Sequence, residues 1–280
     1  MQRAFVMVTS TFEKMLSEAS EYVLAHHVSL GGSYANPAMP LPPPNGSGTF
    51  VRFKIDEGII YGILTAAHVA RWLKFGRNSQ GQFLGLSKPQ NADTIACSVT
   101  FHFIHHVAPL DRFHAYSHEA YRPDLAFIAL GLNRYSNHEL LHNSRFFDLD
   151  ANSEFGFVED PCILSVFFRG ACHDSEISAD GYMNTPLCIG GGEVIKHDTK
   201  TNIQYWEIPN TSRKSIGGGS GAGFWRFRYE EGELKKSLEG VIIAEAENFS
   251  HIEAMATPYL YDSYLTDLKD FCTANISWFS

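Results

Sequence analysis

Residues Gly217–Gly223 read Gly-Gly-Gly-Ser-Gly-Ala-Gly, and the strand-like run Phe224–Phe227 follows them directly. Glycine lacks a side chain, so the backbone can bend sharply or approach another group closely at these positions. The stretch therefore predicts a tight turn that displays the hydroxyl of Ser220, with backbone N–H groups beside it. Taken alone, runs of glycine and serine are usually flexible loops. The choice between a nucleophile and a loop depends on what the rest of the chain supplies.

The composition limits the class of protein. With 280 residues, 44% of them hydrophobic, the chain can form one large domain or two small ones. Its 21 phenylalanines and 12 tyrosines favour a β-rich interior. The net charge of −9 and the lack of a basic stripe in the sequence argue against a nucleic-acid partner.

Nothing in the sequence indicates export or membrane insertion. The first residues lack the long apolar segment of a secretory signal, and no apolar run of about 18 residues marks a transmembrane helix. The five cysteines are odd in number, widely spread and form no CxxC pair, which is typical of reduced thiols. We therefore expect a cytoplasmic protein without a membrane partner.

The first 45 residues differ in pattern from the rest of the chain. Thr9–His27 has apolar residues at helical spacing, and Ser10 with Glu13 forms a capping-box pattern, so a helix is predicted there. The Pro-rich stretch Pro37–Gly48 predicts a linker. This segment can pack on the body of the protein or bind a partner.

From residue 49 onward the pattern changes to short strands separated by turn residues. A final helix is expected over Pro258–Phe271, where apolar residues again follow helical spacing. Many short strands with few helices predict a barrel or sandwich. The predicted strands are Phe50–Ile55, Gly58–Thr65, Ser98–Ile104, Leu125–Leu130, Cys162–Phe168, Ile203–Ile208, Gly223–Tyr229 and Gly240–Ala246.

Two residues stand out as possible partners of Ser220. His68 lies in Leu-Thr-Ala-Ala-His-Val-Ala, where an apolar strand gives way to small residues. Asp124 opens the apolar run Asp-Leu-Ala-Phe-Ile-Ala-Leu, so its carboxylate is expected to be partly buried and to need a hydrogen-bond donor. A serine nucleophile requires a base and a carboxylate that orients the base. Each residue taken alone also fits an ordinary structural role.

The three motifs, in the order His68, Asp124, Ser220, resemble those of the trypsin-like (chymotrypsin-fold) serine peptidases, in a disulfide-free intracellular form. The resemblance covers roughly residues 46–272. It implies an all-β fold of two six-stranded antiparallel β-barrels with added N- and C-terminal helices. The expected units are the N-terminal helix and Pro-rich linker, the first barrel, and the second barrel with the C-terminal helix, at residues 1–45, 46–150 and 151–280.

The resemblance also implies roles for individual residues. Ser220 would be the nucleophile, His68 the general base, and Asp124 the group that orients the base. The backbone N–H groups of Gly218 and Ser220 would form the oxyanion hole. The strand that contains the substrate-binding residues Ile243, Ala244 and Glu245 would flank the specificity pocket and pair with the substrate backbone.

Lys214 matches the position that the family often uses at the base of its specificity pocket. With Arg213 beside it, a preference for an acidic side chain before the cleaved bond is one interpretation. The other interpretation is that both side chains face solvent, as charged pairs usually do.

Three residues depart from the family pattern. Gly219 replaces the usual Asp or Asn before the serine, Ala222 replaces a common second glycine, and Val69 stands where secreted members carry a cysteine. Activation by removal of a propeptide is therefore not expected. Our hypothesis is that the run of three glycines leaves the oxyanion loop poorly formed until substrate or a partner orders it.

Alternative sites fit less well. The histidines between His102 and His118 match no zinc signature, so no metal and no cofactor is expected. The glycine run lacks the Lys-Ser/Thr pair of a phosphate loop, and the order of the three residues is wrong for an α/β-hydrolase. We expect a serine endopeptidase that hydrolyses polypeptides through an acyl-enzyme and has a regulatory protein partner. The alternative is a protease-like scaffold that binds proteins with little catalysis.

Overall fold

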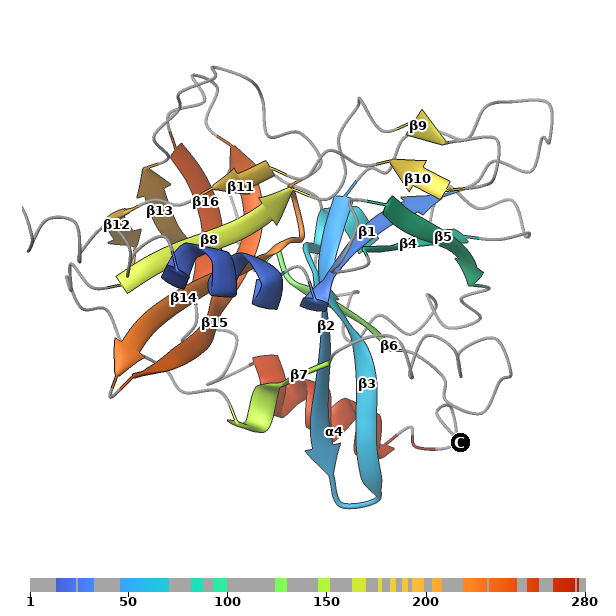
Figure 1. The fold of residues 1–280 in the computed structure, drawn as a ribbon. Coiled ribbons are helices and arrows are strands. Elements are labelled where there is room, and N and C mark those ends of the chain that lie inside the picture. Colours follow the sequence, from blue (N-terminus) through green and yellow to red (C-terminus); the bar gives the residue numbers. More distant parts are fainter. Residues whose placement is uncertain are drawn as a thin grey trace, which may run out of the picture.

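The fold is described from a computed structural model of the chain. The described residues are 14–23, 25–32, 46–70, 82–87, 93–99, 124–129, 146–151, 163–169, 176–177, 182–184, 188–190, 193–198, 203–207, 219–230, 232–245, 251–256, 264–274 and 276. In this part of the chain the protein is mostly β, as the sequence predicted, and its strands form two sheets (Figure 1).

The first sheet has nine strands within the described ranges, in the order β6-β3-β2-β1-β4-β5-β10-β9, with β7 beside β2. All pairs are antiparallel except β2 with β7. The strands are β1 (His27–Gly32), β2 (Gly46–Ile55), β3 (Gly58–Thr65), β4 (Gln82–Ser87), β5 (Asp93–Val99), β6 (Ala126–Ala129), β7 (Phe147–Asp148), β9 (Glu176–Ile177) and β10 (Tyr182–Asn184).

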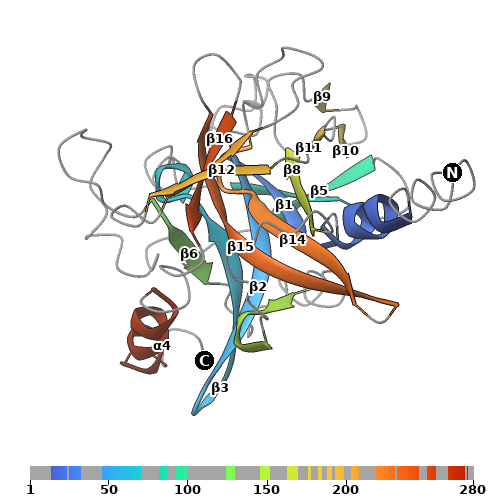
Figure 2. The ribbon, with the colours of Figure 1, turned by 90° about the vertical axis from the view of Figure 1, so that its left-hand side faces the viewer.

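The second sheet has seven strands by the same description, in the order β11-β8-β14-β15-β16-β13-β12, all paired antiparallel. The long β14–β15 hairpin runs through its centre (Figure 2). The strands are β8 (Ile163–Arg169), β11 (Cys188–Gly190), β12 (Glu193–Asp198), β13 (Ile203–Glu207), β14 (Gly223–Glu230), β15 (Glu233–Glu245) and β16 (His251–Ala256).

The sheets differ from the expected six-stranded barrels. They have nine and seven strands, and no strand pairing in the described ranges closes either of them into a barrel. The first sheet also draws strands from outside residues 46–150. β1 lies between β2 and β4, and β9 and β10 extend the sheet from β5. The linker predicted over Pro37–Gly48 is wrong in its last three residues, because β2 already begins at Gly46.

The N-terminal helix packs against both sheets. Residues 14–23 and 25–26 are helical, and His27 then begins β1, so the helix ends earlier than predicted. The ring of Tyr22 packs edge-on against Trp225 of β14, with 5.5 Å between centroids. The ring centroid of His26 lies 5.6 Å from that of Trp225 and 6.2 Å from that of Phe147 of β7. These aromatic contacts join the helix, β7 and β14 in one cluster.

The helix α4 (Leu265–Ala274) packs on the first sheet and lies on the opposite side of the β14–β15 hairpin from the N-terminal helix (Figure 2). Lys269 of α4 pairs with Asp150, in the short 3-10 helix η3 (Leu149–Ala151), and Asp150 also accepts a hydrogen bond from the backbone N–H of Lys54 (2.6 Å). Burial raises the pKa of the Cys272 thiol to about 12, so this cysteine stays protonated. None of the helices in the described ranges is both long and apolar enough to cross a membrane.

His27 is expected to make stability depend on pH. Its imidazole is buried, and burial lowers its pKa from 6.5 to about 4. As the pH falls, His27 is therefore protonated near pH 6.5 in the unfolded chain but only near pH 4 in the folded protein. Stability is complete above pH 6.5 and is lost as the pH falls toward 4, by roughly 3 kcal/mol in total.

Urea unfolding at pH 7.5 and pH 4.5 measures this effect. A His27→Gln variant should lose less stability between the two pH values than the wild type does. An equal loss in both proteins would mean that His27 is not the titrating group.

Candidate active site

The pairing of β3 with β6 brings Asp124 beside His68. The register sets Thr65 opposite Ala126, so the residues that follow β3 lie next to those that precede β6. The ring of Phe127 lies directly over Gly62, where a Cβ atom would overlap it. This close packing fixes the two strands together. Two residues far apart in the sequence therefore meet at one end of the strand pair.

The Asp124 carboxylate contacts His68 at two points. Oδ2 lies 2.6 Å from the ring Nδ1, and Oδ1 accepts a hydrogen bond from the backbone N–H of His68 at 2.9 Å. The Asp124 side chain is 12% exposed and that of His68 is 43% exposed. The neighbours of His68 in the short helical segment 67–70 are buried, so the histidine is its one exposed member. The carboxylate fixes the ring, and the other ring nitrogen, Nε2, is left to act on a substrate or a nucleophile.

Ser220 occupies the second position of a β-turn. The backbone N–H of Ala222 donates to the carbonyl of Gly219 at 3.0 Å, which closes the turn. Gly221, at the third position, has φ +88°, the left-handed value that a type II turn requires there. A glycine is needed at this position because other residues adopt such a φ at a cost. The turn ends where β14 begins at Gly223.

Backbone hydrogen bonds hold this turn between the two sheets. Ser47 of β2 donates its N–H to the carbonyl of Ser220 at 2.8 Å. On the other side, Gly221 donates to the Ile242 carbonyl at 2.7 Å, and Ile242 donates to Ala222 at 2.9 Å. The part of the glycine loop from residue 219 onward is therefore firmly held, whereas Gly217 and Gly218 lie outside the described residues.

The turn also packs against the end of the strand that leads to His68. A Cβ atom on Gly221 would overlap the carbonyl oxygen of Ser47 and the hydroxyl of Thr65. Thr65 is the last residue of β3 and donates its hydroxyl to the Ser47 carbonyl at 2.6 Å. Because Thr65 precedes His68 by three residues, the turn with Ser220 lies against the segment that presents the histidine.

The predicted substrate-binding residues Ile243, Ala244 and Glu245 lie in β15. β14 begins opposite Val241, so these three residues extend beyond it, and they follow the Ile242 carbonyl that holds the Ser220 turn. On the other side the register with β16 shifts at Ile243, which marks a β-bulge. Lys214 and the segment from His102 to His118 lie outside the described residues.

Sequence reasoning missed two residues that position the turn, Ser47 and Thr65. Ser47 lies in a Gly-Ser-Gly stretch directly after the prolines, where a linker was expected, and its contribution is a backbone N–H. A backbone donor leaves no mark in the sequence. Thr65 was placed at the end of a strand, but its hydroxyl contact depends on a second strand that the sequence did not predict to start at Gly46.

Comparison with known proteins gives likenesses in structure only. No protein-family model and no curated protein matches the chain. One similar solved structure is a thermostable serine protease, AL20, from an extremophilic microorganism, with 10% identity, TM-score 0.44, and 89% and 96% of the two chains covered. Another is a Glu endopeptidase in complex with MPD (14%, TM-score 0.38, 88% and 97% covered). A third is the catalytically inactive tobacco etch virus protease complexed with substrate (9%, TM-score 0.40, 88% and 84% covered).

Proposed function

We propose that the chain is a trypsin-like serine endopeptidase of the chymotrypsin fold, with Ser220, His68 and Asp124 as its catalytic residues. The observation that carries the proposal is the double contact of Asp124 with the ring Nδ1 and the backbone N–H of His68. A carboxylate in this position holds the imidazole in the tautomer whose Nε2 accepts a proton. The packing of the Ser220 turn against the end of β3 supports the same assignment.

In the proposed reaction His68 carries the proton through both halves. Its Nε2 takes the proton of the Ser220 hydroxyl as Oγ attacks the carbonyl carbon of the substrate. The same proton passes to the leaving amine when the C–N bond breaks, which leaves an ester on Ser220. His68 then takes a proton from water, the hydroxide attacks the ester, and the proton returns to Oγ. Asp124 stabilises the imidazolium in each half, and no step calls for a cofactor.

The oxyanion that forms in this reaction needs backbone donors close to Ser220. The N–H groups of Gly221 and Ala222 are already donated to Ile242 and Gly219. This supports the N–H of Ser220 itself, with that of Gly218, as the donors. In this proposal substrate or a partner orders Gly217 and Gly218, while the turn from Gly219 onward is held by its own hydrogen bonds.

The substrate in this proposal is an extended polypeptide that pairs with Ile243, Ala244 and Glu245 of β15. These residues reach beyond the start of β14, so a peptide strand added there would run past the Ser220 turn. Lys214 would favour an acidic side chain before the cleaved bond. The two sheets would correspond to the two barrels of the fold, with His68 and Asp124 from the first and Ser220 from the second. A regulatory protein partner that orders Gly217 and Gly218 would switch on the peptidase activity in the cytoplasm.

A fluorophosphonate probe tests the proposal. A serine activated by a base displaces fluoride from the probe and gains a stable phosphonate ester, which mass spectrometry detects. We expect wild type to be labelled and Ser220→Ala to be unlabelled. Ser17→Ala, which removes an exposed serine of the N-terminal helix, is the matched control and should be labelled like wild type. A folded wild-type protein that resists labelling, with or without peptide substrates, would instead indicate a protein-binding scaffold.

A further inference from the structure

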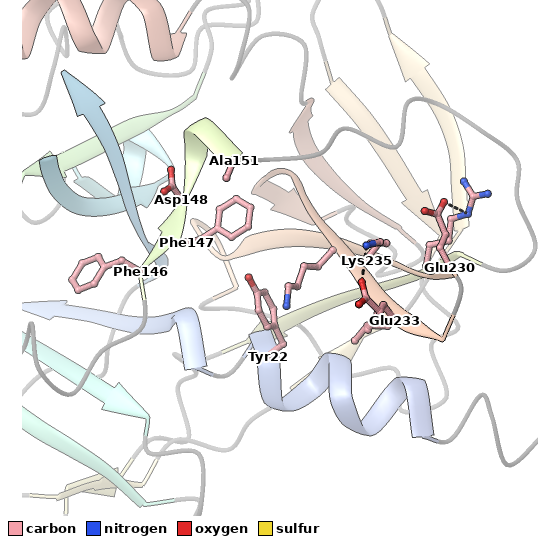
Figure 3. A pocket seen from close by; sticks show the side chains of 11 residues that line it. Tyr22, Phe146, Phe147, Asp148, Ala151, Glu230, Glu233 and Lys235 are labelled. Carbon is pink, nitrogen blue, oxygen red and sulfur yellow. Dashed lines mark hydrogen bonds and ion pairs between the residues drawn. The ribbon is translucent and has the colours of Figure 1, made fainter. Parts of the chain in front are cut away.

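A cavity of about 780 Å³ lies between the N-terminal helix, the β7–η3 segment and the turn end of the β14–β15 hairpin (Figure 3). Its volume is typical of ligand pockets. The turn end of the hairpin is far from Ser220, because the eight residues of β14 separate them, roughly 25 Å of extended strand. The cavity is therefore distinct from the candidate active site.

One end of the cavity is lined by rings. Tyr22 and Phe147 lie on the same side in Figure 3. Leu234 also lines the cavity and supplies an aliphatic side chain. Both rings pack edge-on against Trp225, whose centroid lies 5.5 Å from that of Tyr22 and 4.9 Å from that of Phe147. This fixed apolar wall suits an aromatic or branched side chain.

Among the described residues that line the cavity, each acid pairs with a basic side chain, and one cation, Lys236, has no carboxylate partner. Arg228 pairs with Glu230, and Lys235 donates to Glu233 at 2.8 Å. The third acid, Asp148, pairs with Arg52. Lys236 instead has its ammonium 4.3 Å from the centroid of the Tyr22 ring.

Lys236 and the apolar wall together suit a ligand that carries one negative charge next to an apolar group. The Lys236 ammonium lies against the Tyr22 ring, which is part of the apolar wall. A ligand that contacts both must therefore carry its negative charge and its apolar group on the same residue. A phosphate dianion fits poorly because three carboxylates also line the cavity. A C-terminal apolar amino acid has both features, since its free carboxylate and its side chain share one Cα.

The strand beside the cavity favours a peptide. β15 pairs with β16 only from Gly240 to Glu245, whereas its pairing with β14 extends down to Glu233. Within the described residues, the outer edge of β15 next to the cavity thus has no neighbouring strand. Such an edge offers backbone donors and acceptors to an extended chain.

We infer that this cavity is a second peptide site, which binds the C-terminus of a partner protein that ends in an aromatic or branched apolar residue. Lys236 binds the carboxylate, the wall of Tyr22, Phe147 and Leu234 receives the last side chain, and the preceding residues lie along the edge of β15.

The test is an NMR titration with Ac-Thr-Val-Phe carrying either a free carboxylate or a C-terminal amide. The wild type should bind the acid roughly tenfold more tightly than the amide, as a charge-assisted hydrogen bond allows. Lys236→Met keeps the aliphatic stem and should bring the ratio near one. Lys235→Met is the matched control, because Lys235 is the adjacent strand residue and already pairs with Glu233, and should leave the ratio unchanged. Equal binding of acid and amide by wild type, or equal losses in both variants, would overturn the inference.

Two further arms separate this site from its alternatives. His68→Ala should bind the acid as wild type does, whether or not Ser220 is a nucleophile. Loss of binding in that variant would put the peptide at the candidate active site and refute a second site. N-acetyl-phenylalanine should bind at least fivefold more weakly than the tripeptide acid, since it cannot pair with β15. Equal binding would mean a site for small free acids and would overturn the peptide assignment.

Discussion

Replacing Asp124 with asparagine is expected to slow fluorophosphonate labelling of Ser220 about 10⁴-fold, or about 5.5 kcal/mol in activation free energy, with the fold intact. The reason lies in the two contacts of the carboxylate. Oδ1 accepts from the backbone N–H of His68, which can only donate. The asparagine oxygen would take this position, and its NH₂ group would face the ring Nδ1.

An NH₂ group facing Nδ1 reverses the tautomer of His68. Because NH₂ can only donate, Nδ1 must become the acceptor, and the ring proton moves to Nε2. A protonated Nε2 cannot take the proton of Ser220. The variant would thus keep both hydrogen bonds and its stability while losing the base, a combination that thermal unfolding and labelling rates can detect together.

Asp148→Asn is the matched control for this substitution. Asp148 is also a partly buried aspartate with a basic partner, Arg52 at 3.3 Å, but it lies on β7, away from His68. Its asparagine variant should be labelled at the wild-type rate. If Asp124→Asn were also labelled within tenfold of wild type, Asp124 would not orient a catalytic base.

The strands next to His68 and Asp124 could be predicted from their local patterns, whereas the meeting of the two residues was expected only from the resemblance to the serine peptidases. The apolar runs that became β3 and β6 are visible in the sequence, and their antiparallel pairing brings the end of one to the start of the other. This strand pairing brings together His68, which follows β3, and Asp124, which precedes β6. The turn at Ser220 could also be predicted from a local signal, since only glycine readily adopts the φ of +88° found at Gly221.

The parts that escaped prediction have weak local signals. β1 begins at His27, directly after the helical residues 25–26, with no glycine or proline to mark the change. β9 and β10 are two and three residues long, too short for an alternating pattern. β10 pairs with β5, and β9 pairs only with β10 in the described ranges. Their place in the first sheet is set by long-range pairing, which a local pattern does not encode.

Gly221→Ala is expected to lower the free energy of unfolding by about 3 kcal/mol and to abolish labelling of Ser220. The left-handed φ alone costs a non-glycine residue about 1 kcal/mol. The added methyl would also overlap the Ser47 carbonyl oxygen and the Thr65 hydroxyl, which adds an overpacking cost of about 1–3 kcal/mol. Urea unfolding measures the first effect and probe labelling the second.

Gly232→Ala separates the two costs. Gly232 has nearly the same φ, +85°, in the β14–β15 turn, but nothing lies within 4 Å of the position that its Cβ would take. This variant should lose only about 1 kcal/mol and keep full labelling. If both variants lost the same stability, the contact of the turn with Ser47 and Thr65 would contribute nothing. If Gly221→Ala is the more costly and also unlabelled, the nucleophile is held in place by the first sheet, and the reaction depends on the two sheets meeting at this one glycine.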